Sequence, residues 1–342
     1  MPPPGGPATG GQQLRPGMPP GSERGDRPDL GGAPGRDMSR DWRDQRRIEE
    51  RDGRTIIREG DNRVIIREGG REVIRHDELG RLRRGARDVD VVTGRGGERT
   101  VTVVRPDGSR IITMEDEDGN LMRRIRRTTD GRDVIIIDNS RRPARRDRGP
   151  GFYPPPVVSL PPLVLGIPRE RYIVEAEEVE PEIIEETLMA PPVERVERAY
   201  SLDEIRYNQR LREKMRRVDV DTINFAFGSA EIGPSEVGRL DAIARALDAA
   251  IRRNPNEVFL VEGHTDAVGS DTDNLALSDR RAESVALALT ETYNIPPENL
   301  VTQGYGEQYL KVQTDGPELA NRRVSLRRIT PLMSQSGAPP AQ

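Results

Sequence analysis

The sequence contains no cysteine among its 342 residues. Disulfide bonds, thiolate metal sites and a lipidated N-terminal cysteine are therefore excluded. Histidine is almost as scarce, because only His76 and His264 are present, and neither has a partner at a spacing typical of zinc sites. We therefore expect no metal site, and we interpret His264 as a residue at the end of a strand that shapes the following loop.

Large apolar residues are also few. The chain is 33% hydrophobic, 4% aromatic and 33% charged, and its mean hydropathy is −0.73. Such a composition does not supply hydrophobic cores for the whole length of the chain. With 34 glycines and 29 prolines, parts of the chain are predicted to be disordered linkers.

No long hydrophobic run is present. Residues 154–167 form the most apolar segment, but it is too short for a transmembrane helix and is broken by prolines. Residues 1–10 contain no apolar core of a secretory signal. If the chain is exported, we expect its signal to lie outside this sequence.

The net charge of −4 is unevenly distributed. Residues 1–150 contain 33 arginines against 27 acidic residues, a balance of +6, which leaves −10 for the remainder. The arginines alternate with Asp and Glu, so no continuous basic face results. We therefore expect no nucleic acid partner.

Short repeats characterise the first half of the chain. Residues 1–50 are rich in Pro, Gly and Arg and are predicted to be a disordered arm. Residues 54–60, RTIIREG, recur nine positions later as RVIIREG, and Asp-Gly pairs separate further β-branched runs. These are hairpin signals, and they predict an antiparallel β-meander of about seven strands within residues 51–140.

The middle of the chain reads as a connector. Residues 141–200 are rich in Pro and Glu and are interpreted as a linker, to which residues 172–174 or 183–184 could add a strand of unknown location. Residues 201–217 are predicted to form a helix, because Ser201 and Glu204 match a capping box ahead of spaced apolar residues.

The C-terminal part alternates between strand and helix patterns. Residues 218–331 are predicted to form one βαβαββ domain of the α+β class, followed by a flexible tail at 332–342. The expected strands are 223–227, 258–261, 300–304 and 324–328. The expected helices are 234–253 and a second one that begins at Ser278 and follows a polar loop at 263–273.

Charged residues gather around that polar loop. Glu262, Asp266, Asp271 and Asp273 form a carboxylate cluster, but neither calcium-loop spacing nor an apolar pocket that would create a catalytic acid is evident. The residues alone allow two interpretations of Asp266 and Arg281: a salt bridge between loop and helix, or a clamp for a zwitterionic ligand. The two side chains can meet only if the loop folds back over the helix N-terminus.

Four motifs carry a family resemblance. They are Gly-His-Thr-Asp at 263–266, the Asn274, Leu277, Ser278 and Arg281 series, Gly-Tyr-Gly-Glu at 304–307, and Asn-Arg-Arg-Val at 321–324. In this order they resemble the OmpA-like peptidoglycan-binding domain. The resemblance implies that Asp266 accepts the ammonium and Arg281 binds the carboxylate of diaminopimelate. It also implies ligand-binding roles for Thr265, Asn274 and Leu277, with Arg322 as a secondary contact.

The resemblance further implies a non-catalytic envelope protein without a cofactor. Peptidoglycan would be its partner, and the periplasm or the outer membrane its location. The loop at 308–320 departs from the family pattern, which bears on the rim of the site. For the β-rich segment we favour the role of a spacer over that of a second binding surface. The candidate partners that such a segment would connect to the C-terminal domain are the outer membrane and another envelope protein. The alternative function is a self-associating scaffold that acts through this segment, with a C-terminal domain that binds no ligand.

Overall fold

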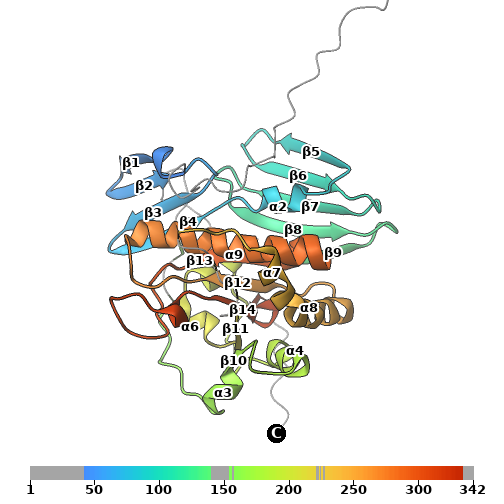
Figure 1. Cartoon of the computed structure of the whole chain (residues 1–342). Helices are drawn as coiled ribbons and strands as arrows, with labels where there is room; N and C mark the ends of the chain where they lie inside the picture. The colour runs from blue at the N-terminus through green and yellow to red at the C-terminus, as the bar shows by residue number, and fades with distance from the viewer. Residues whose placement is uncertain are drawn as a thin grey trace, which may run out of the picture. The chain divides into compact units, whose positions relative to one another are not determined.

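The computed structural model describes residues 42–139, 154–155, 158–220, 223, 225 and 228–333 (Figure 1). The described residues belong to one compact unit. Most of the predicted N-terminal arm lies outside the described residues. Its last positions are not disordered as predicted, because strand β1 occupies Arg47–Arg51 and pairs with the following strand.

Two antiparallel meanders occupy the segment predicted as one. The first sheet has the order β1-β2-β3-β4 and the second the order β5-β6-β7-β8-β9. The predicted antiparallel meander is confirmed, but it is divided into two sheets because α2, Leu79–Arg83, interrupts the strand pattern and buries Leu79 and Leu82. The remaining strands are β2 Arg54–Arg58, β3 Val64–Glu68, β4 Arg71–Arg75, β5 Asp88–Thr93, β6 Arg99–Val104, β7 Arg110–Glu115, β8 Leu121–Arg127 and β9 Asp133–Asp138.

The nine-residue repeat corresponds to one hairpin. Its two copies form β2 and β3, which pair antiparallel with Ile57 opposite Ile65. Asn62 in the connecting turn adopts a positive φ of 63°, a conformation that Asn tolerates better than most residues. The turn chemistry that predicted hairpins is therefore confirmed at this position.

A third, mixed sheet forms the C-terminal region. Its strands run in the order β10-β11-β14-β12-β13. The succession of a strand, a helical segment, a strand, a helix and two strands follows the predicted βαβαββ order. The elements are β10 Ile173–Glu175, β11 Arg217–Val220, α7 Pro234–Val237, η1 Gly238–Leu240, α8 Asp241–Arg253, β12 Phe259–Gly263, α9 Asp271–Tyr293, η2 Pro297–Asn299, β13 Leu300–Gly304, η3 Leu319–Asn321 and β14 Val324–Arg328. The strand expected at 223–227 lies mostly outside the described residues, and the first strand of the predicted order is found at β11.

Strand β12 lies at the centre of the hydrophobic core. Phe259 and Val261 pack with α8 and α9 on one face of the sheet. Val258 and Leu260 pack on the opposite face with residues from 200–215 and from β9. Burial on both faces explains why residues 258–261 are continuously apolar rather than alternating.

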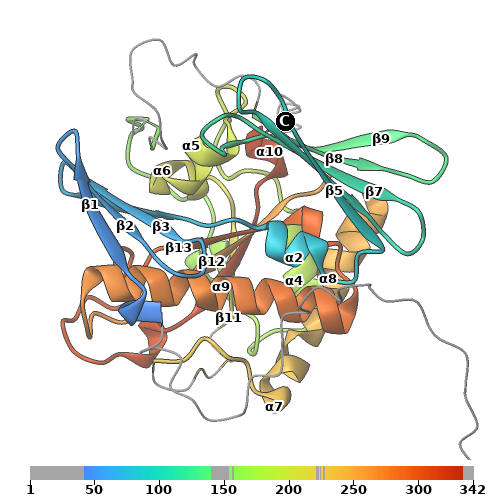
Figure 2. The same ribbon diagram turned by 90° about the horizontal axis from the view of Figure 1, so that it is seen from above.

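Helix α9 begins earlier than predicted. Ser270 is its N-cap, and the Ser270 hydroxyl accepts a hydrogen bond from Asp273 N at 3.2 Å. The prediction that this helix begins at Ser278 was wrong. Apolar residues that face the third sheet recur at helical spacing only after Ser278, so the earlier turns gave no such signal. The two preceding turns are also helical, and this end of α9 lies beside the first sheet (Figure 2). There Leu275 and Ala276 pack against isoleucines of that sheet.

The predicted linker contributes folded elements to the C-terminal region. Strand β10 pairs parallel with β11. Residues 183–184 do not form a strand, because they lie in α4, Pro181–Met189, whose Ile184 and Leu188 are buried in the main core. The segment also contains α3, Arg169–Tyr172.

The helix predicted at 201–217 is broken in two. The capping box of Ser201 and Glu204 is present at the start of α5, Leu202–Arg206. Asn208 then starts a second helix, α6, Gln209–Arg212, by accepting a hydrogen bond from Leu211 N. The start of the predicted tail is helical as well, since α10 spans Thr330–Met333. Among the described residues, no helix combines the length and apolarity needed to cross a bilayer.

Candidate functional site

Close packing of α9 against two strand ends shapes the candidate site. A Cβ atom at Gly263 would lie 1.9 Å from the Ser278 carbonyl oxygen, and one at Gly304 would lie 2.4 Å from Asp279 N. Only glycine fits at such distances. The strand ends therefore bring the loop after β12 directly against the N-terminal half of α9.

Arg281 lies on α9 about three turns from the start of the helix. It is buried, its Nε donates a hydrogen bond to Ser229 O at 3.0 Å, and its guanidinium lies over the Phe225 ring at 4.8 Å. Among the described residues, no carboxylate forms an ion pair with Arg281. Burial, followed by the charge of Arg322, lowers the pKa of Arg281 to about 10, and Asp266 offsets only part of this effect. The site thus holds a desolvated cation without a paired anion.

Asp266 is buried in the loop and faces the same site. Its Oδ2 lies 3.5 Å from Arg322 Nε, and its Oδ1 accepts a long hydrogen bond of 3.4 Å from Val268 N. The side chain of Arg322 is 37% exposed, which places it at the rim. The salt bridge considered for Asp266 therefore forms with Arg322 and not with Arg281.

Loop and helix meet in a different way than expected. Arg281 lies about three turns along α9 rather than at its N-terminus. Asp266 forms no ion pair with Arg281 among the described residues, although its charge partly offsets the lowering of the Arg281 pKa. The physical reason is the longer helix, whose added N-terminal turns move Arg281 away from the helix end.

The other predicted ligand residues lie nearby. Asn274 Nδ2 donates to Asp266 O at 3.3 Å and to Glu307 Oε2 at 2.6 Å, so Asn274 holds the loop against the GYGE segment. Thr265 N donates to Gly306 O at 3.0 Å, while the buried Thr265 hydroxyl has no hydrogen-bond partner among the described residues. Leu277 is half-buried on α9, and its role stays a prediction.

The divergent loop at 308–320 is held by its own contacts. Asn321 Oδ1 accepts hydrogen bonds from Lys311 N at 2.7 Å and from Val312 N at 2.9 Å. Lys311 Nζ also lies 3.5 Å from Asp219, a buried residue of β11. Contacts with Asn321 and Asp219 therefore hold this loop, although its sequence departs from the family pattern. Arg322 follows Asn321 in the chain.

His264 and Glu262 serve the framework rather than the candidate site. His264 is buried and stacks on Tyr305 with ring centroids 5.6 Å apart. Burial, reinforced by Arg323, lowers the pKa of His264 to about 3, so the ring is neutral at pH 7. Burial alone would raise the pKa of Glu262, but Arg327 and Arg212 hold it well below its usual range. No group of three candidate metal ligands occurs within the described part of the chain.

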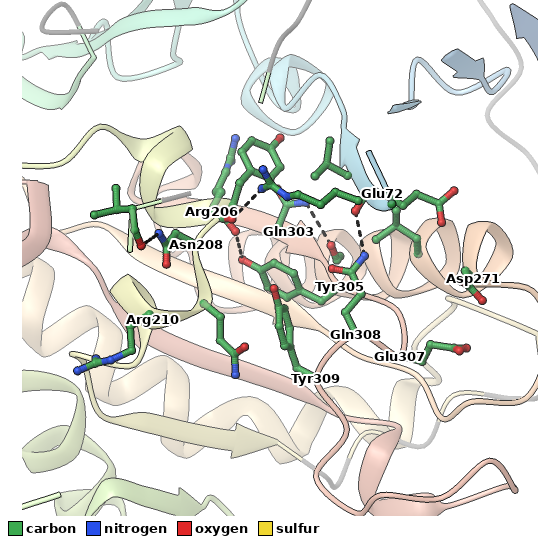
Figure 3. Close-up of a pocket in the computed structure, with 18 of the residues that line it drawn as sticks. Glu72, Arg206, Asn208, Arg210, Asp271, Gln303, Tyr305, Glu307, Gln308 and Tyr309 are labelled. Atoms are coloured by element: carbon green, nitrogen blue, oxygen red, sulfur yellow. Dashed lines mark hydrogen bonds between the residues drawn. The ribbon is translucent and has the colours of Figure 1, made fainter. Parts of the chain in front are cut away.

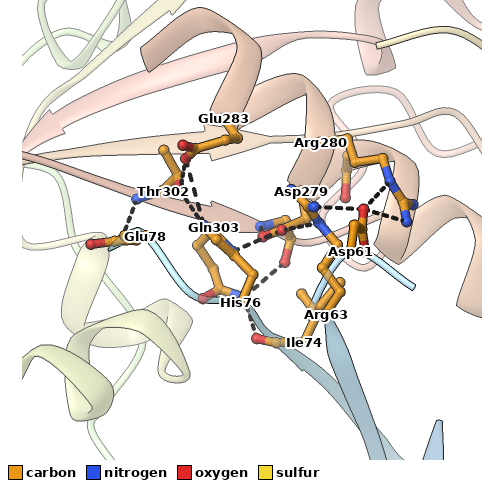
Figure 4. Close-up of polar contacts among 12 residues, drawn as sticks. Asp61, Arg63, Ile74, His76, Glu78, Asp279, Arg280, Glu283, Thr302 and Gln303 are labelled. Atoms are coloured by element: carbon orange, nitrogen blue, oxygen red, sulfur yellow. Dashed lines mark hydrogen bonds and ion pairs between the residues drawn. The ribbon is translucent and has the colours of Figure 1, made fainter. Parts of the chain in front are cut away.

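Sequence reasoning missed the polar contacts on the opposite side of α9. The buried Asp279 accepts from Arg63 Nε at 2.9 Å, from Gly304 N at 2.9 Å and from His76 Nδ1 at 2.8 Å (Figure 4). Arg63 and His76 belong to the first sheet and its continuation. Neither lies near Asp279 in sequence, so no local pattern signals these pairs.

A second group of contacts joins the segment after β4 to β8, α5 and β13. Glu78 is buried, pairs with Arg124 at 3.0 Å and with Arg206, and accepts a hydrogen bond from Thr302 N at 3.2 Å. Trp42, the only tryptophan, lies under the guanidinium of Arg280 at 3.8 Å. The first sheet is therefore fixed to α9 by charge pairs beside the candidate site.

A separate cavity of about 620 Å³ lies between β4, the α5–α6 segment and the loop after β13 (Figure 3). None of the six predicted ligand residues lines it. Several of its polar groups bond to one another: Tyr305 OH donates to Arg206 O at 2.8 Å, and Gln308 Nε2 donates to Glu72 O at 2.9 Å. We assign no role to this cavity.

Comparison with known proteins identifies the family. The sequence profile of the OmpA family matches residues 224–323. The putative lipoprotein YfiB of Escherichia coli is 33% identical over 113 residues, which cover 32% of this chain and 68% of YfiB. The chain belongs to the OmpA family.

Two further comparisons concern the same region. The peptidoglycan-associated lipoprotein of Pseudomonas putida is 36% identical over 112 residues, which cover 32% of this chain and only 63% of that protein. The crystal structure of the peptidoglycan-associated lipoprotein from Burkholderia pseudomallei matches with 25% identity and a TM-score of 0.27, covering 31% of this chain and 87% of that one.

The OmpA-family match contains all six predicted ligand residues. Residues 224–323 include the loop after β12, the whole of α9 and Arg322. The two N-terminal sheets lie outside the match. This OmpA-family chain therefore combines a region that the family profile matches with two β-sheets that the profile does not cover.

Proposed function

We propose that this chain binds peptidoglycan non-covalently through Asp266 and Arg281. The observation that supports the proposal most is the buried guanidinium of Arg281, which has no carboxylate partner among the described residues. An unpaired buried cation is unfavourable, and a ligand carboxylate would remove that penalty. The printed names of two relatives, which are peptidoglycan-associated lipoproteins, point to the polymer.

The ligand group would be the zwitterionic end of diaminopimelate in the stem peptide. The guanidinium of Arg281 suits a carboxylate, and Asp266 suits an ammonium group. Arg322 Nε lies 3.5 Å from Asp266 Oδ2 and pairs with that carboxylate. The ligand ammonium would take over this role, and Arg322 at the rim would turn toward the ligand carboxylate.

Thr265 and Asn274 would complete the site. The buried Thr265 hydroxyl lacks a partner among the described residues and would accept from the ligand or donate to it. Asn274 would act indirectly, because it holds the Asp266 backbone and Glu307. The role is binding without catalysis, and it places the chain at the cell wall in the periplasm, with the N-terminal sheets facing another envelope component.

The test is binding of the purified chain to a diaminopimelate-containing stem peptide, with the lysine-containing peptide as the ligand control. Arg281→Ala removes the carboxylate partner. One charge-assisted hydrogen bond contributes about 1.5–3 kcal/mol, so the dissociation constant should rise roughly 10- to 150-fold. Sedimentation with purified peptidoglycan should fall in parallel.

A matched variant separates binding from folding. Arg252→Ala removes an exposed arginine of α8 whose only ion-pair partner among the described residues is Asp248 in the preceding turn, and it should leave binding unchanged. The thermal midpoint of Arg281→Ala should not fall much, because the substitution removes a desolvated cation that has no paired anion. Equal affinity for both peptides would contradict the diaminopimelate assignment. Full sedimentation of Arg281→Ala would contradict the clamp itself.

A further inference from the structure

Strand β5 is an uncovered edge of the second sheet. Within the described residues it pairs only with β6, and all six of its residues are exposed (Figure 1). Three of them are valines: Val89 is 36% exposed, Val91 45% and Val92 57%. An exposed edge strand with this composition readily accepts another strand.

The hydrogen bonds between β5 and β6 determine which N–H and C=O groups of β5 point to the free edge. Gly94 N donates to Glu98 O at 2.8 Å, in continuation of the register in which Thr93 lies opposite Arg99. In an antiparallel pair, residues alternate between facing the partner strand and facing away from it. The N–H and C=O groups of Val89, Val91 and Thr93 therefore point to the free edge.

Two other edge strands of the N-terminal sheets, β1 and β9, are protected in ways that β5 is not. Strand β1 has the sequence RIEER, and charged side chains discourage pairing. Strand β9 has an irregular register with β8, and its Ile136 and Ile137 are buried in a core cluster. Strand β5 has neither lysine, proline nor a register shift.

We propose that β5 pairs antiparallel with β5 of a second copy of this chain, with Val91 opposite Val91. Val89 then lies opposite Thr93 of the other copy, so the three outward-facing residues hydrogen-bond to one another. Their side chains share the face of the sheet that carries the buried Val101 and Val103. The two five-stranded sheets become one continuous sheet related by a two-fold axis.

Charge selects this register among those that the backbone allows. With Val91 opposite Val91, Asp90 lies opposite Val92 of the second copy, and no two acidic residues face each other. A shift toward the N-terminus that keeps the outward groups paired would place Asp90 opposite Asp90, which is unfavourable. A shift in the other direction shortens the ladder within β5 from five residue pairs to three.

The absence of cysteine provides a direct test in the full-length chain. The Cα atoms of a hydrogen-bonded antiparallel pair lie about 5.5 Å apart, within the range that a disulfide spans. Val91→Cys should therefore form a covalent dimer under mild oxidation. Thr93→Cys is the matched control, because four residues separate it from its own copy along the strand, roughly 14 Å.

Equilibrium measurements test the same register without a crosslink. In sedimentation equilibrium, the mass of the wild-type chain should rise with concentration from 38.2 kDa toward twice that value. Val92→Lys places a lysine opposite each Asp90 and should tighten the dimer, whereas Val92→Asp should weaken it, each by roughly 2- to 30-fold. Val91→Pro removes one outward N–H, which an edge strand tolerates, and should leave a folded monomer.

Three results would overturn the proposal. One is a mass of 38.2 kDa at every concentration up to the solubility limit. Another is equal crosslinking rates for Val91→Cys and Thr93→Cys, which indicates random collision. A third is a dimer that persists in both Val91→Pro and Val92→Asp, which places the contact on another surface or assigns the edge to a different strand. None of these measurements involves peptidoglycan, so the dimer and the proposed function can fail separately.

Discussion

His76 predicts a measurable pH dependence of stability. Its ring is buried, its Nδ1 lies 2.8 Å from Asp279 Oδ2, and its Nε2 lies 3.0 Å from the Thr302 hydroxyl (Figure 4). The Thr302 hydroxyl donates in turn to Glu283 at 3.0 Å. Both ring nitrogens thus face acceptors, which suits the protonated imidazolium.

The size of the effect follows from the pKa. Burial opposes the charged ring, but the charge of Asp279 and the hydrogen bonds to Asp279 and Glu283 raise the pKa of His76 from 6.5 to about 9. Each unit of pKa difference between the folded and unfolded states corresponds to 1.36 kcal/mol. The protonated ring therefore contributes about 3 kcal/mol to the free energy of unfolding.

The sign of the effect is set by the raised pKa. The contribution is complete below pH 6.5, where both states are protonated. Between pH 6.5 and 9 the unfolded chain loses the proton first, so the free energy of unfolding falls by up to 1.36 kcal/mol per pH unit. The other histidine adds little in this window, because its pKa of about 3 in the folded state makes its contribution complete above pH 6.5.

Urea denaturation between pH 6 and 9.5 provides the assay. Trp42 is the only tryptophan and packs against Arg280 on α9, so its fluorescence reports on the contact between the first sheet and the helix. The free energy of unfolding is obtained by linear extrapolation at each pH. His76→Asn is the matched control, because it keeps a polar side chain but does not titrate.

Wild type and His76→Asn should differ in how the free energy of unfolding depends on pH. Wild type should lose about 3 kcal/mol between pH 6.5 and 9, and His76→Asn should be flat over the same range and less stable than wild type at pH 6. Parallel curves for the two proteins would refute the buried imidazolium. A free energy of unfolding that rises with pH in wild type would refute the sign.

Two further predictions concern local packing and capping. Gly304→Ala would place a Cβ 2.4 Å from Asp279 N and should destabilise the chain by about 1–3 kcal/mol or more, whereas Gly166→Ala, in open surroundings, should change the urea midpoint little; similar midpoints for both variants would argue against tight helix–strand packing. Ser201→Ala removes the cap of α5 and should lower stability by about 1 kcal/mol in thermal unfolding. An unchanged thermal midpoint would mean that this cap contributes nothing.

Local patterns predicted the elements that surround the site. The apolar run at 258–261 is confirmed in β12, and the βαβαββ order is confirmed in the third sheet. The capping box of Ser201 was visible because its two members are three positions apart. Patterns failed where an element faces a distant segment, as at the start of α9, whose first turns pack on the first sheet.

The candidate site shows the same division. Motif spacing indicated Asp266 and Arg281, because both belong to one strand, loop and helix. It did not indicate Ser229 and Phe225, which contact Arg281, nor the pairing of Asp266 with Arg322. These contacts depend on how loops far apart in the chain come together, and exposed polar segments carry no periodic signal of their partners.

The amino-acid sequence by itself determined the strands, the hairpin turns and the charged residues of the loop, because propensity and periodicity act over a few neighbouring positions. Only the tertiary structure decided which charges are buried in pairs, such as Asp279 with His76 and Arg63, and which are not, such as Arg281. It also decided that one sheet edge, β5, stays open among the described residues. The physical reason is that desolvation and ion pairing depend on distances in space, and those are set by the packing of segments more than two hundred residues apart in the chain.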